Sequence, residues 1–283
     1  MSDPFTRSNV VPMYQGMTWE AWGERWTAQL VAAGARPGTV ALRSYQVARC
    51  GRALGGRPGD VTEEELVAWL GSHEWDRGTL RSYRAALRSF YAWAVRTGRL
   101  EESPAEDLPS PGVVPPTPRP TPEIIYREAL GRADERVRLM VRLAAELGMR
   151  RAEVAQVHAR DVEPDIVGYS MRVHGKGGRV RWVPMPDDLA RIVLRRAKGG
   201  YLFPGDDDGH LSARWVGKLV SRLMPPGWSM HTLRHRAASR WYAVDHDLVT
   251  TRELLGHASL ATTQAYVKAP DEARRRLVLA AAS

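Results

Sequence analysis

The sequence has very little of what cross-links a chain or carries it into a membrane. Its one cysteine, Cys50, leaves no partner for an internal disulfide and no thiolate cluster for a metal, which favours a reducing cytosol. Residues 1–15 contain no apolar run of signal-peptide length. No stretch approaches the roughly 18 uninterrupted apolar residues of a membrane span. These absences predict a cytoplasmic protein with no membrane partner.

The usual sequence signs of a nucleotide or metal cofactor are also missing. Residues 175–178 are rich in glycine around Lys176, but they lack the first glycine and the hydroxyl residue of the phosphate loop G-x-x-x-x-G-K-[ST]. His231 and His235 have the spacing of a zinc pair, yet Thr232 stands where the zinc-protease motif needs glutamate. We therefore expect no metal and no cofactor.

Positive charge, in contrast, is abundant. The chain has 41 lysines and arginines against 32 acids, a net charge of +9, which points to a polyanionic partner. Residues 1–108 are neutral overall, but their charges are sorted: residues 25–59 and 77–100 hold arginines without acids, and acids collect in 60–76 and 101–107. Such blocks predict one face for phosphates and another in solvent, although an arginine-rich surface without a ligand has the same composition.

A proline-rich segment divides the chain. Residues 108–122 read LPSPGVVPPTPRPTP, and proline lacks a backbone donor and fixes φ, so this stretch cannot join a helix or a central strand. It is typical of a semi-extended linker. We predict an N-terminal domain over residues 1–107, a linker over 108–121 and a second domain over 122–283.

Helical periodicity predicts an all-helical first domain. Thr18 caps a helix with tryptophans at spacings of three and four on its inward face, and Thr39 opens a second helix. Thr62 and Glu65 form a capping box for a third. The best-defined helix covers residues 79–97. Its apolar stripe consists of Leu80, Tyr83, Leu87, Phe90 and Ala94. We expect the aromatic side chains of this domain to form its core.

The second domain mixes helix and strand. One helix begins at Thr121 and Pro122, and a longer one covers residues 134–147. Residues 166–173 and 180–183 read as two strands joined by the glycine-rich turn, and the remainder reads as helical. The predicted fold class is therefore mostly α with a small β-sheet, a helical domain followed by an α+β domain.

Four short signals follow one another in the second domain. They are Arg150 after a helix stop with Glu153 three residues later, Lys176 at the tip of the turn, His231-Thr232-Leu233-Arg234-His235, and Leu255-Gly256-His257 followed by Tyr266. Each alone is weak, because an arginine near a glutamate is usually a surface ion pair and a lysine on a turn is usually solvated.

Taken together, in this order and at this spacing, the four signals resemble the tyrosine recombinase (phage integrase) family. That family has an arginine in Gly-Leu/Met-Arg-x-x-Glu, a lysine on a β-turn, His-x-Leu-Arg-His, Leu-Gly-His and then a nucleophilic tyrosine. Residues 81–93 also look like the last helix of its core-binding domain. The composition is similar to that of small integrases from temperate phages of high-GC actinobacteria.

The resemblance implies an enzyme that cleaves and rejoins DNA through a 3′-phosphotyrosine at Tyr266. A tyrosine with a pKa near 10 needs a base or a strong positive field, and the phosphorane-like transition state gathers negative charge that guanidinium groups can hold. By resemblance, Arg150 and Arg234 clamp the phosphate, with His257 as a third donor.

The remaining roles follow from the same resemblance. Lys176 is expected to protonate the leaving 5′-oxygen, and His231 to act as the general base toward the tyrosine. Glu153 is expected to orient nearby side chains and His235 to brace the helix that carries the second arginine, although a purely structural role is as well supported for both. The arginines would take the place of a metal ion.

The resemblance further implies a SAM-like core-binding domain and a catalytic domain that form a C-shaped clamp around double-stranded DNA. Two rows of arginines are expected to contact it, Arg43, Arg49 and Arg52, and Arg81, Arg84 and Arg88. We expect a homotetramer on DNA and a monomer without it, with the tail after Tyr266 docked on a neighbour. Because few residues precede the first helix, we expect short core-type attachment sites. A directionality factor stays an open question.

Other readings of the same motifs remain. A Xer-like resolvase of chromosome dimers has the same catalytic residues, and a type IB topoisomerase shares the chemistry without a site requirement. A catalytically silent sequence-specific DNA-binding protein is the alternative outside the enzymes. By resemblance, the place of action is the cytoplasm of a bacterial host, at the nucleoid.

Overall fold

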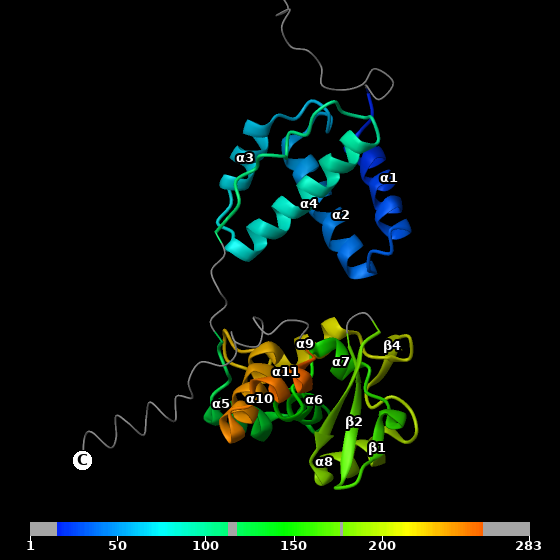
Figure 1. The fold of residues 1–283 in the computed structure, drawn as a ribbon, viewed down its shortest axis with the longest axis vertical. Helices are drawn as coiled ribbons and strands as arrows, with labels where there is room; N and C mark the ends of the chain where they lie inside the picture. The colour runs from blue at the N-terminus through cyan, green and yellow to red at the C-terminus, as the bar shows by residue number, and fades with distance from the viewer. Residues whose placement is uncertain (1–15, 113–117, 176–177, 257–283) are drawn as a thin grey trace, which may run out of the picture. The chain divides into compact units, whose positions relative to one another are not determined.

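The computed structural model describes residues 16–112, 118–175 and 178–256, in two compact units that lie within residues 1–114 and 115–283 (Figure 1). Each unit is a body with its own core, and the predicted clamp, which concerns their mutual placement, stays a prediction. In the described part of the chain, no helix is both long and apolar enough to cross a membrane. The described linker residues, 108–112 and 118–122, form neither helix nor strand.

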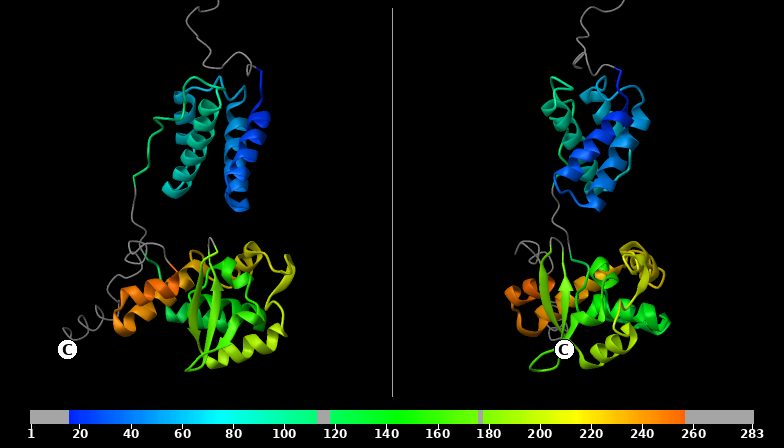
Figure 2. Two further views of the ribbon diagram at one scale, coloured as in Figure 1. Left: turned by 45° about the vertical axis from the view of Figure 1, so that its right-hand side comes forward. Right: turned by 90° about the vertical axis from the view of Figure 1, so that its right-hand side faces the viewer.

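The N-terminal unit is helical, as expected. Its elements are α1 (Trp19–Ala32), α2 (Pro37–Leu54), α3 (Glu63–Gly71) and α4 (Arg77–Arg96). The two further views in Figure 2 show α1 and α2 running side by side, and α2 also packs against α3 and α4. The long helix α2 is therefore the element that the others share.

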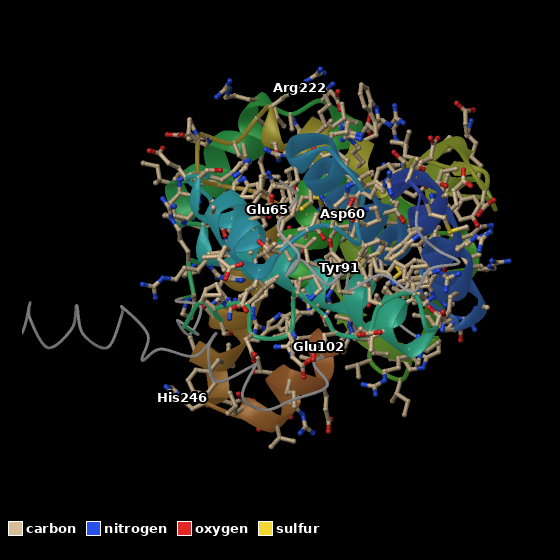
Figure 3. The ribbon with its side chains drawn as sticks, turned by 90° about the horizontal axis from the view of Figure 1, so that it is seen from above. Asp60, Glu65, Tyr91, Glu102, Arg222 and His246 are labelled. Atoms are coloured by element: carbon tan, nitrogen blue, oxygen red, sulfur yellow. The ribbon has the colours of Figure 1, made fainter. Side chains whose placement is uncertain are left out.

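Local capping sets where these helices begin. The Thr18 side chain accepts from the Ala21 amide, and the predicted capping box of Thr62 and Glu65 is present (Glu65 is labelled in Figure 3). The other two helices begin two residues earlier than predicted. Pro37 opens α2 because its fixed φ suits a first helical position, and Asp76 caps α4.

Aromatic side chains fill the core of this unit, which confirms the expectation for the tryptophans of α1. Trp22 and Trp26 are each 1% exposed, and Phe90 and Tyr91 are fully buried. Trp26 meets Phe90 edge to face at 5.4 Å between ring centroids, a geometry that adds about 0.5–1.5 kcal/mol beyond the area buried. The predicted apolar stripe of α4 is thus the centre of the unit.

The second unit combines helices with a small antiparallel sheet. Its helices are α5 (Glu123–Arg132), α6 (Glu135–Glu146), α7 (Arg151–Ala155), α8 (Asp187–Ala197), α9 (Ala213–Ser221), α10 (Met230–Asp245) and α11 (Leu248–Leu255). Its strands are β1 (Val162–Pro164), β2 (Tyr169–His174), β3 (Val180–Met185) and β4 (Pro204–Asp207). The sheet has the order β1-β2-β3, with Met171 opposite both Val162 and Val183.

Two boundaries in this unit differ from the prediction, and two short strands were not predicted. Strand β2 begins at Tyr169, because Ile166 and Val167 are exposed in a turn where Asp165 accepts from backbone amides. The short strands β1 and β4 were not predicted, since neither is long enough to show an alternation. Helix α5 begins at Glu123, and Thr121 is instead bonded to α10.

Helix α10 is central to the second unit. It packs against α6, and residues 230–238 are buried apart from His231. Helix α7 packs against α9, α11 against β3, and α8 against β2. In Figure 1 the orange α10 and α11 lie on one side of the green strands. The first turns of α10, which carry three of the predicted site residues, are therefore held from several sides.

Candidate active site

The first part of the site forms where α6 ends. Gly148 has a φ of +59°, and a Cβ there would lie 2.7 Å from the Trp241 ring, so backbone and packing both require glycine. The turn places Arg150 at the N-cap of α7. The Arg150 amide donates to Glu153 Oε2 (2.8 Å), and Arg150 Nη1 donates to Oε1 (2.7 Å). One carboxylate thus holds both the backbone and the guanidinium of Arg150.

Glu153 is the centre of a buried ion-pair network, with its side chain 4% exposed. Arg181 donates to it through Nη1 (3.0 Å to Oε1) and Nη2 (2.7 Å to Oε2), and Arg234 Nη1 lies 3.7 Å from Oε2. Burial acts to raise the pKa of Glu153, but the bonds from Arg181, the Arg150 amide and the charge of Arg234 outweigh it, so the pKa is lowered. The ionised carboxylate therefore fixes three guanidinium groups around itself.

Arg234 is only 1% exposed. Its Nη1 donates to the carbonyl of Gly148 (2.5 Å) and its Nη2 to that of Leu255 (2.6 Å). Arg234 therefore ties α10 to the turn before α7 and to the end of α11.

Arg181 belongs to this network but was not predicted. It lies in β3, its side chain is 10% exposed, and its Nε donates to the Leu254 carbonyl at 2.8 Å. In β3 it shares the inward face with Val183 and Met185, because side chains alternate along a strand. An arginine at an inward position requires a buried partner, and that is the signal by which the sequence could have shown it.

A pocket of about 530 Å³ opens beside the network. It is lined by residues of α7, α9, α10 and the turns before them: Arg150, Arg151, Arg214, Gly217, Lys218, Ser221, Ser229, Met230, His231 and Arg234. Lysines and arginines dominate this lining, and no carboxylate occurs among the described residues that form it. Such a pocket suits a phosphate diester and the negative charge that develops on it during displacement. Arg151, Arg214 and Lys218 were not predicted.

The two histidines of α10 form a pair. His231 Nε2 lies 2.9 Å from His235 Nε2, and the Arg119 amide donates to His235 Nδ1 at 3.1 Å. Partial burial of the ring, followed by the charges of Arg234 and Arg150, lowers the pKa of His231. Burial, followed by His231 and Arg234, lowers the pKa of His235 to about 4. Both rings are therefore neutral at pH 7.

Five of the eight residues predicted for the catalytic site lie together. These are Arg150, Glu153, His231, Arg234 and His235. Lys176, His257 and Tyr266 lie outside the described residues, so their roles stay predictions. The catalytic roles assigned to the five from sequence are likewise predictions that the geometry accommodates.

The arginines predicted to contact DNA have different surroundings in the N-terminal unit. Arg52 is exposed, and Arg43 and Arg81 are half-buried. Arg49 donates to the Tyr83 hydroxyl (3.1 Å) and its guanidinium lies over the Trp75 ring. The guanidinium groups of the two others lie near protein acceptors that compete with DNA phosphates for them. Arg84 Nε donates to the Leu108 carbonyl (2.6 Å), and Arg88 lines a hollow that is rich in acids.

Comparisons with known proteins agree on one family. A sequence model of the phage integrase family matches residues 123–273, more than half of the chain. Tyrosine recombinase XerC of Xanthomonas campestris pv. campestris is 32% identical over 208 residues, 66% of this chain and 63% of that protein. XerC of Corynebacterium efficiens is 33% identical over 232 residues, 73% of this chain and 74% of that protein. The chain thus spans less than two thirds of the first of these relatives.

Solved structures share the fold. A lambda integrase tetramer bound to a Holliday junction matches with a TM-score of 0.72 at 18% identity, over 90% of this chain and 78% of that chain. The second unit is therefore an α+β domain of the tyrosine recombinase type, mostly helical with a small sheet. The chain belongs to the phage integrase family.

Proposed function

We propose that this protein is a site-specific DNA recombinase that cleaves and rejoins DNA through a phosphotyrosine intermediate at Tyr266. The observation that carries the proposal is the pocket in which Arg150, Arg234 and His231 meet, backed by Glu153. A buried carboxylate that fixes arginines beside a cationic pocket suits a reaction whose charge develops on a phosphate. Family membership supports the same chemistry.

In the proposed mechanism, the phenol oxygen of Tyr266 attacks the phosphorus and the 5′-oxygen of the DNA leaves. Arg150 and Arg234 stabilise the charge on the non-bridging oxygens, with His257 as a further donor. The tyrosine gives its proton to His231, and Lys176 protonates the departing oxygen. Because the phosphate bond energy is kept in the phosphotyrosine, a different 5′-hydroxyl can reverse the step and complete the exchange.

We further propose that the partner is double-stranded DNA bound by a homotetramer. The lambda integrase relative in fold is a tetramer bound to a Holliday junction, which supports this assembly. The net charge of +9 and the basic pocket support a DNA ligand, whose binding should weaken steeply with salt as counterions are released. A directionality factor and a location at the nucleoid remain expectations.

A nicked suicide substrate tests the proposal. Incubation with such DNA should give a covalent protein–DNA band, because the fragment that carries the 5′-hydroxyl diffuses away and the intermediate cannot be resealed. Tyr266→Phe should abolish the band and leave DNA binding intact, and EDTA should not weaken it. A band that survives Tyr266→Phe contradicts the proposed nucleophile. Binding without any band in the wild type supports the catalytically silent DNA-binding protein instead.

The recombinase could serve as a phage integrase or as a Xer-like resolvase. We propose the phage integrase, because the composition of the chain is similar to that of small phage integrases. The named XerC relatives, at 32–33% identity, favour the second. The two differ in the DNA they recombine, since an integrase joins two different attachment sites and a resolvase acts on two copies of one chromosomal site. Recombination assays on plasmids that carry either arrangement distinguish them.

A further inference from the structure

The end of the linker is bonded directly to the helix that carries the candidate catalytic histidine. The Thr121 amide donates to the Thr232 carbonyl (3.0 Å), and the Thr121 hydroxyl donates to Thr232 Oγ1 (2.8 Å). Two residues earlier, the Arg119 amide donates to His235 Nδ1 (3.1 Å). The last residues before α5 therefore lie along the first two turns of α10.

These contacts fix where the imidazole protons are. A backbone amide can only donate, so His235 Nδ1 must accept, and the proton of the neutral ring sits on Nε2. That nitrogen lies 2.9 Å from His231 Nε2 and donates to it. Neutral His231 then carries its own proton on Nδ1. The chain of bonds that runs from Arg119 to His231 thus selects one of two tautomers in each ring.

We propose that the Arg119 amide, acting through His235, holds His231 as the Nδ1–H tautomer, which donates a hydrogen bond, and that release of this linker contact allows His231 to act as a base. Arg119 and His235 are then positioning residues for His231. The inference about the tautomer stands on the contacts alone, whereas its consequence for the reaction rests on the proposed function.

The reason is that the two rings are locked together. His231 can offer a lone pair at Nδ1 only if its proton is on Nε2, and His235 must then accept at its own Nε2 and carry its proton on Nδ1. While the Arg119 amide points at that Nδ1, two hydrogens would face each other, so this arrangement is excluded. Without the amide, His235 gives its Nε2 proton to His231 and takes one from water on Nδ1, and His231 releases its Nδ1 proton to water.

The charges that surround His231 favour the neutral ring that this argument needs. Arg150 lies before α7, Arg234 on α10 itself, and Arg214 and Lys218 on α9, and all of them line the same pocket as His231. Cations on three elements disfavour an imidazolium, so the ring changes tautomer rather than charge. The linker is the covalent connection between the two units. A conformational change that moves Arg119 therefore alters its bond to His235 and, through it, the tautomer of His231 in the pocket.

A matched pair of variants tests this inference in the full chain without DNA. Arg119→Pro removes the amide hydrogen, because proline has none, whereas Arg119→Ala keeps the amide and removes only the guanidinium that lies 4.3 Å from the Trp228 ring centroid. Nitrogen-15 chemical shifts of labelled histidine rings report which nitrogen is protonated. The wild type and Arg119→Ala should show His231 protonated at Nδ1, and Arg119→Pro should move its proton toward Nε2.

His235→Ala is a second variant that leaves the linker unchanged. It removes the donor that faces His231 Nε2, so His231 should again move toward the Nε2–H tautomer. A wild-type His231 protonated at Nε2 would overturn the inference. So would a His231 tautomer that is the same in the wild type, Arg119→Pro and His235→Ala.

The rate of covalent complex formation on the nicked substrate separates the inference from the proposed function. If His231 is the base, Arg119→Pro should form the complex roughly threefold or more faster than Arg119→Ala at pH 7, since the base-competent tautomer becomes more populated. A shifted tautomer with an unchanged or slower rate overturns the part that concerns the base. A shifted tautomer with no complex in either variant overturns the proposed function and leaves the tautomer inference standing.

Discussion

The two units of this protein bury different kinds of side chain. The core of the N-terminal unit is almost entirely hydrocarbon and aromatic, with Gln46 and Arg99 as its buried polar residues among those described. The second unit buries charged or titratable side chains at several places. They are Glu153, Asp161, His210, Arg234, His235 and Arg236. A buried charge is costly unless it is paired, so the buried charges of the second unit require specific partners. The first unit is therefore held together mainly by apolar packing, and the second is built around a polar site.

The contrast also explains which arginines the sequence could assign. In the N-terminal unit, the described arginines other than the buried Arg99 are exposed or half-buried, and sequence spacing says which face they occupy but not what they touch. In the second unit, Arg150 and Arg234 meet at a carboxylate, so their position follows from a specific partner. The sequence therefore outlines the charged face of the first unit, whereas in the second unit it identifies two arginines that share one carboxylate.

Among the substitutions that test this contrast, Glu153→Ala should lower the free energy of unfolding the most. It leaves the buried guanidiniums of Arg181 and Arg234 without their carboxylate, and breaking a buried pair costs about 3–5 kcal/mol. Urea-dependent hydrogen exchange of α6 and α10 peptides measures the free energy of unfolding of this unit. Glu135→Ala is the control, because its ion pair with Arg196 has side chains that are 52% and 46% exposed, and it should cost about 1 kcal/mol or less. Equal losses for the two variants would remove the distinction between buried and exposed charge.

Acidification should destabilise the second unit more than the first. Folding lowers the pKa of His235 to about 4 from its ordinary 6.5, so the stability it contributes is present above pH 6.5 and is lost as the pH falls toward 4. The full loss corresponds to about 3 kcal/mol for this buried ring. Glu153, whose pKa is also lowered, adds a further loss below its ordinary 4.5.

Hydrogen exchange in urea at pH 7.5 and pH 4.5 measures this dependence for each unit separately. His235→Ala should lower the stability of the second unit at pH 7.5 and make it less sensitive to pH. A second unit with the same pH dependence in wild type and variant would contradict the lowered pKa of His235.

Local signals were sufficient for the fold class and for part of the site. Some features act on residues at most four positions away, so the sequence displays them. They are the helix caps Thr18 and Thr62, the helix stop at Gly148 and the pair of Arg150 and Glu153. Motif order then related these residues to His231, Arg234 and His235 through a resemblance. The fold class predicted in this way, mostly helical with a small sheet, is confirmed by the structure and by its similarity to lambda integrase.

The parts that were missed depend on contacts across long stretches of sequence. Arg181 bonds from strand β3 to Glu153 in helix α7, and the Arg119 amide reaches His235 from the linker. These partners lie 28 and 116 residues apart, so no local spacing pairs them, although the alternation in β3 does mark Arg181 as inward-facing. Strand β1 was missed because three residues show no alternation, and β2 was placed too early because two apolar residues, Ile166 and Val167, stand exposed in a turn.

Tyr91→Phe tests the core of the N-terminal unit and should have a smaller effect. The Tyr91 hydroxyl, fully buried (Figure 3 labels this residue), donates to the Pro58 carbonyl at 3.0 Å. Its loss leaves a buried acceptor unsatisfied, at a cost of about 1–2 kcal/mol. Burial raises the pKa of the Cys50 thiol to about 12, so urea-dependent labelling of this single cysteine reports unfolding of the unit. Tyr45→Phe, at an exposed position, should change the stability by less than about 0.5 kcal/mol.

The smallest effect should be that of Arg88→Ala on DNA binding, although this arginine is part of a predicted DNA-contacting row. It lines a hollow of about 600 Å³ together with Glu63, Glu101, Glu102, Glu106 and Asp107. Five carboxylates repel a phosphate backbone, so Arg88 is better suited to balance their charge than to contact DNA.

Arg52 is exposed in the last turn of α2, and no acidic residue occurs in residues 25–59. Arg52→Ala should therefore reduce the slope of log affinity against log salt by about 1, whereas Arg88→Ala should leave the slope unchanged. If both variants reduce the slope equally, the acidic hollow does not decide which arginines contact DNA. Acidic neighbours would then not distinguish the DNA-contacting arginines of the first unit from the others.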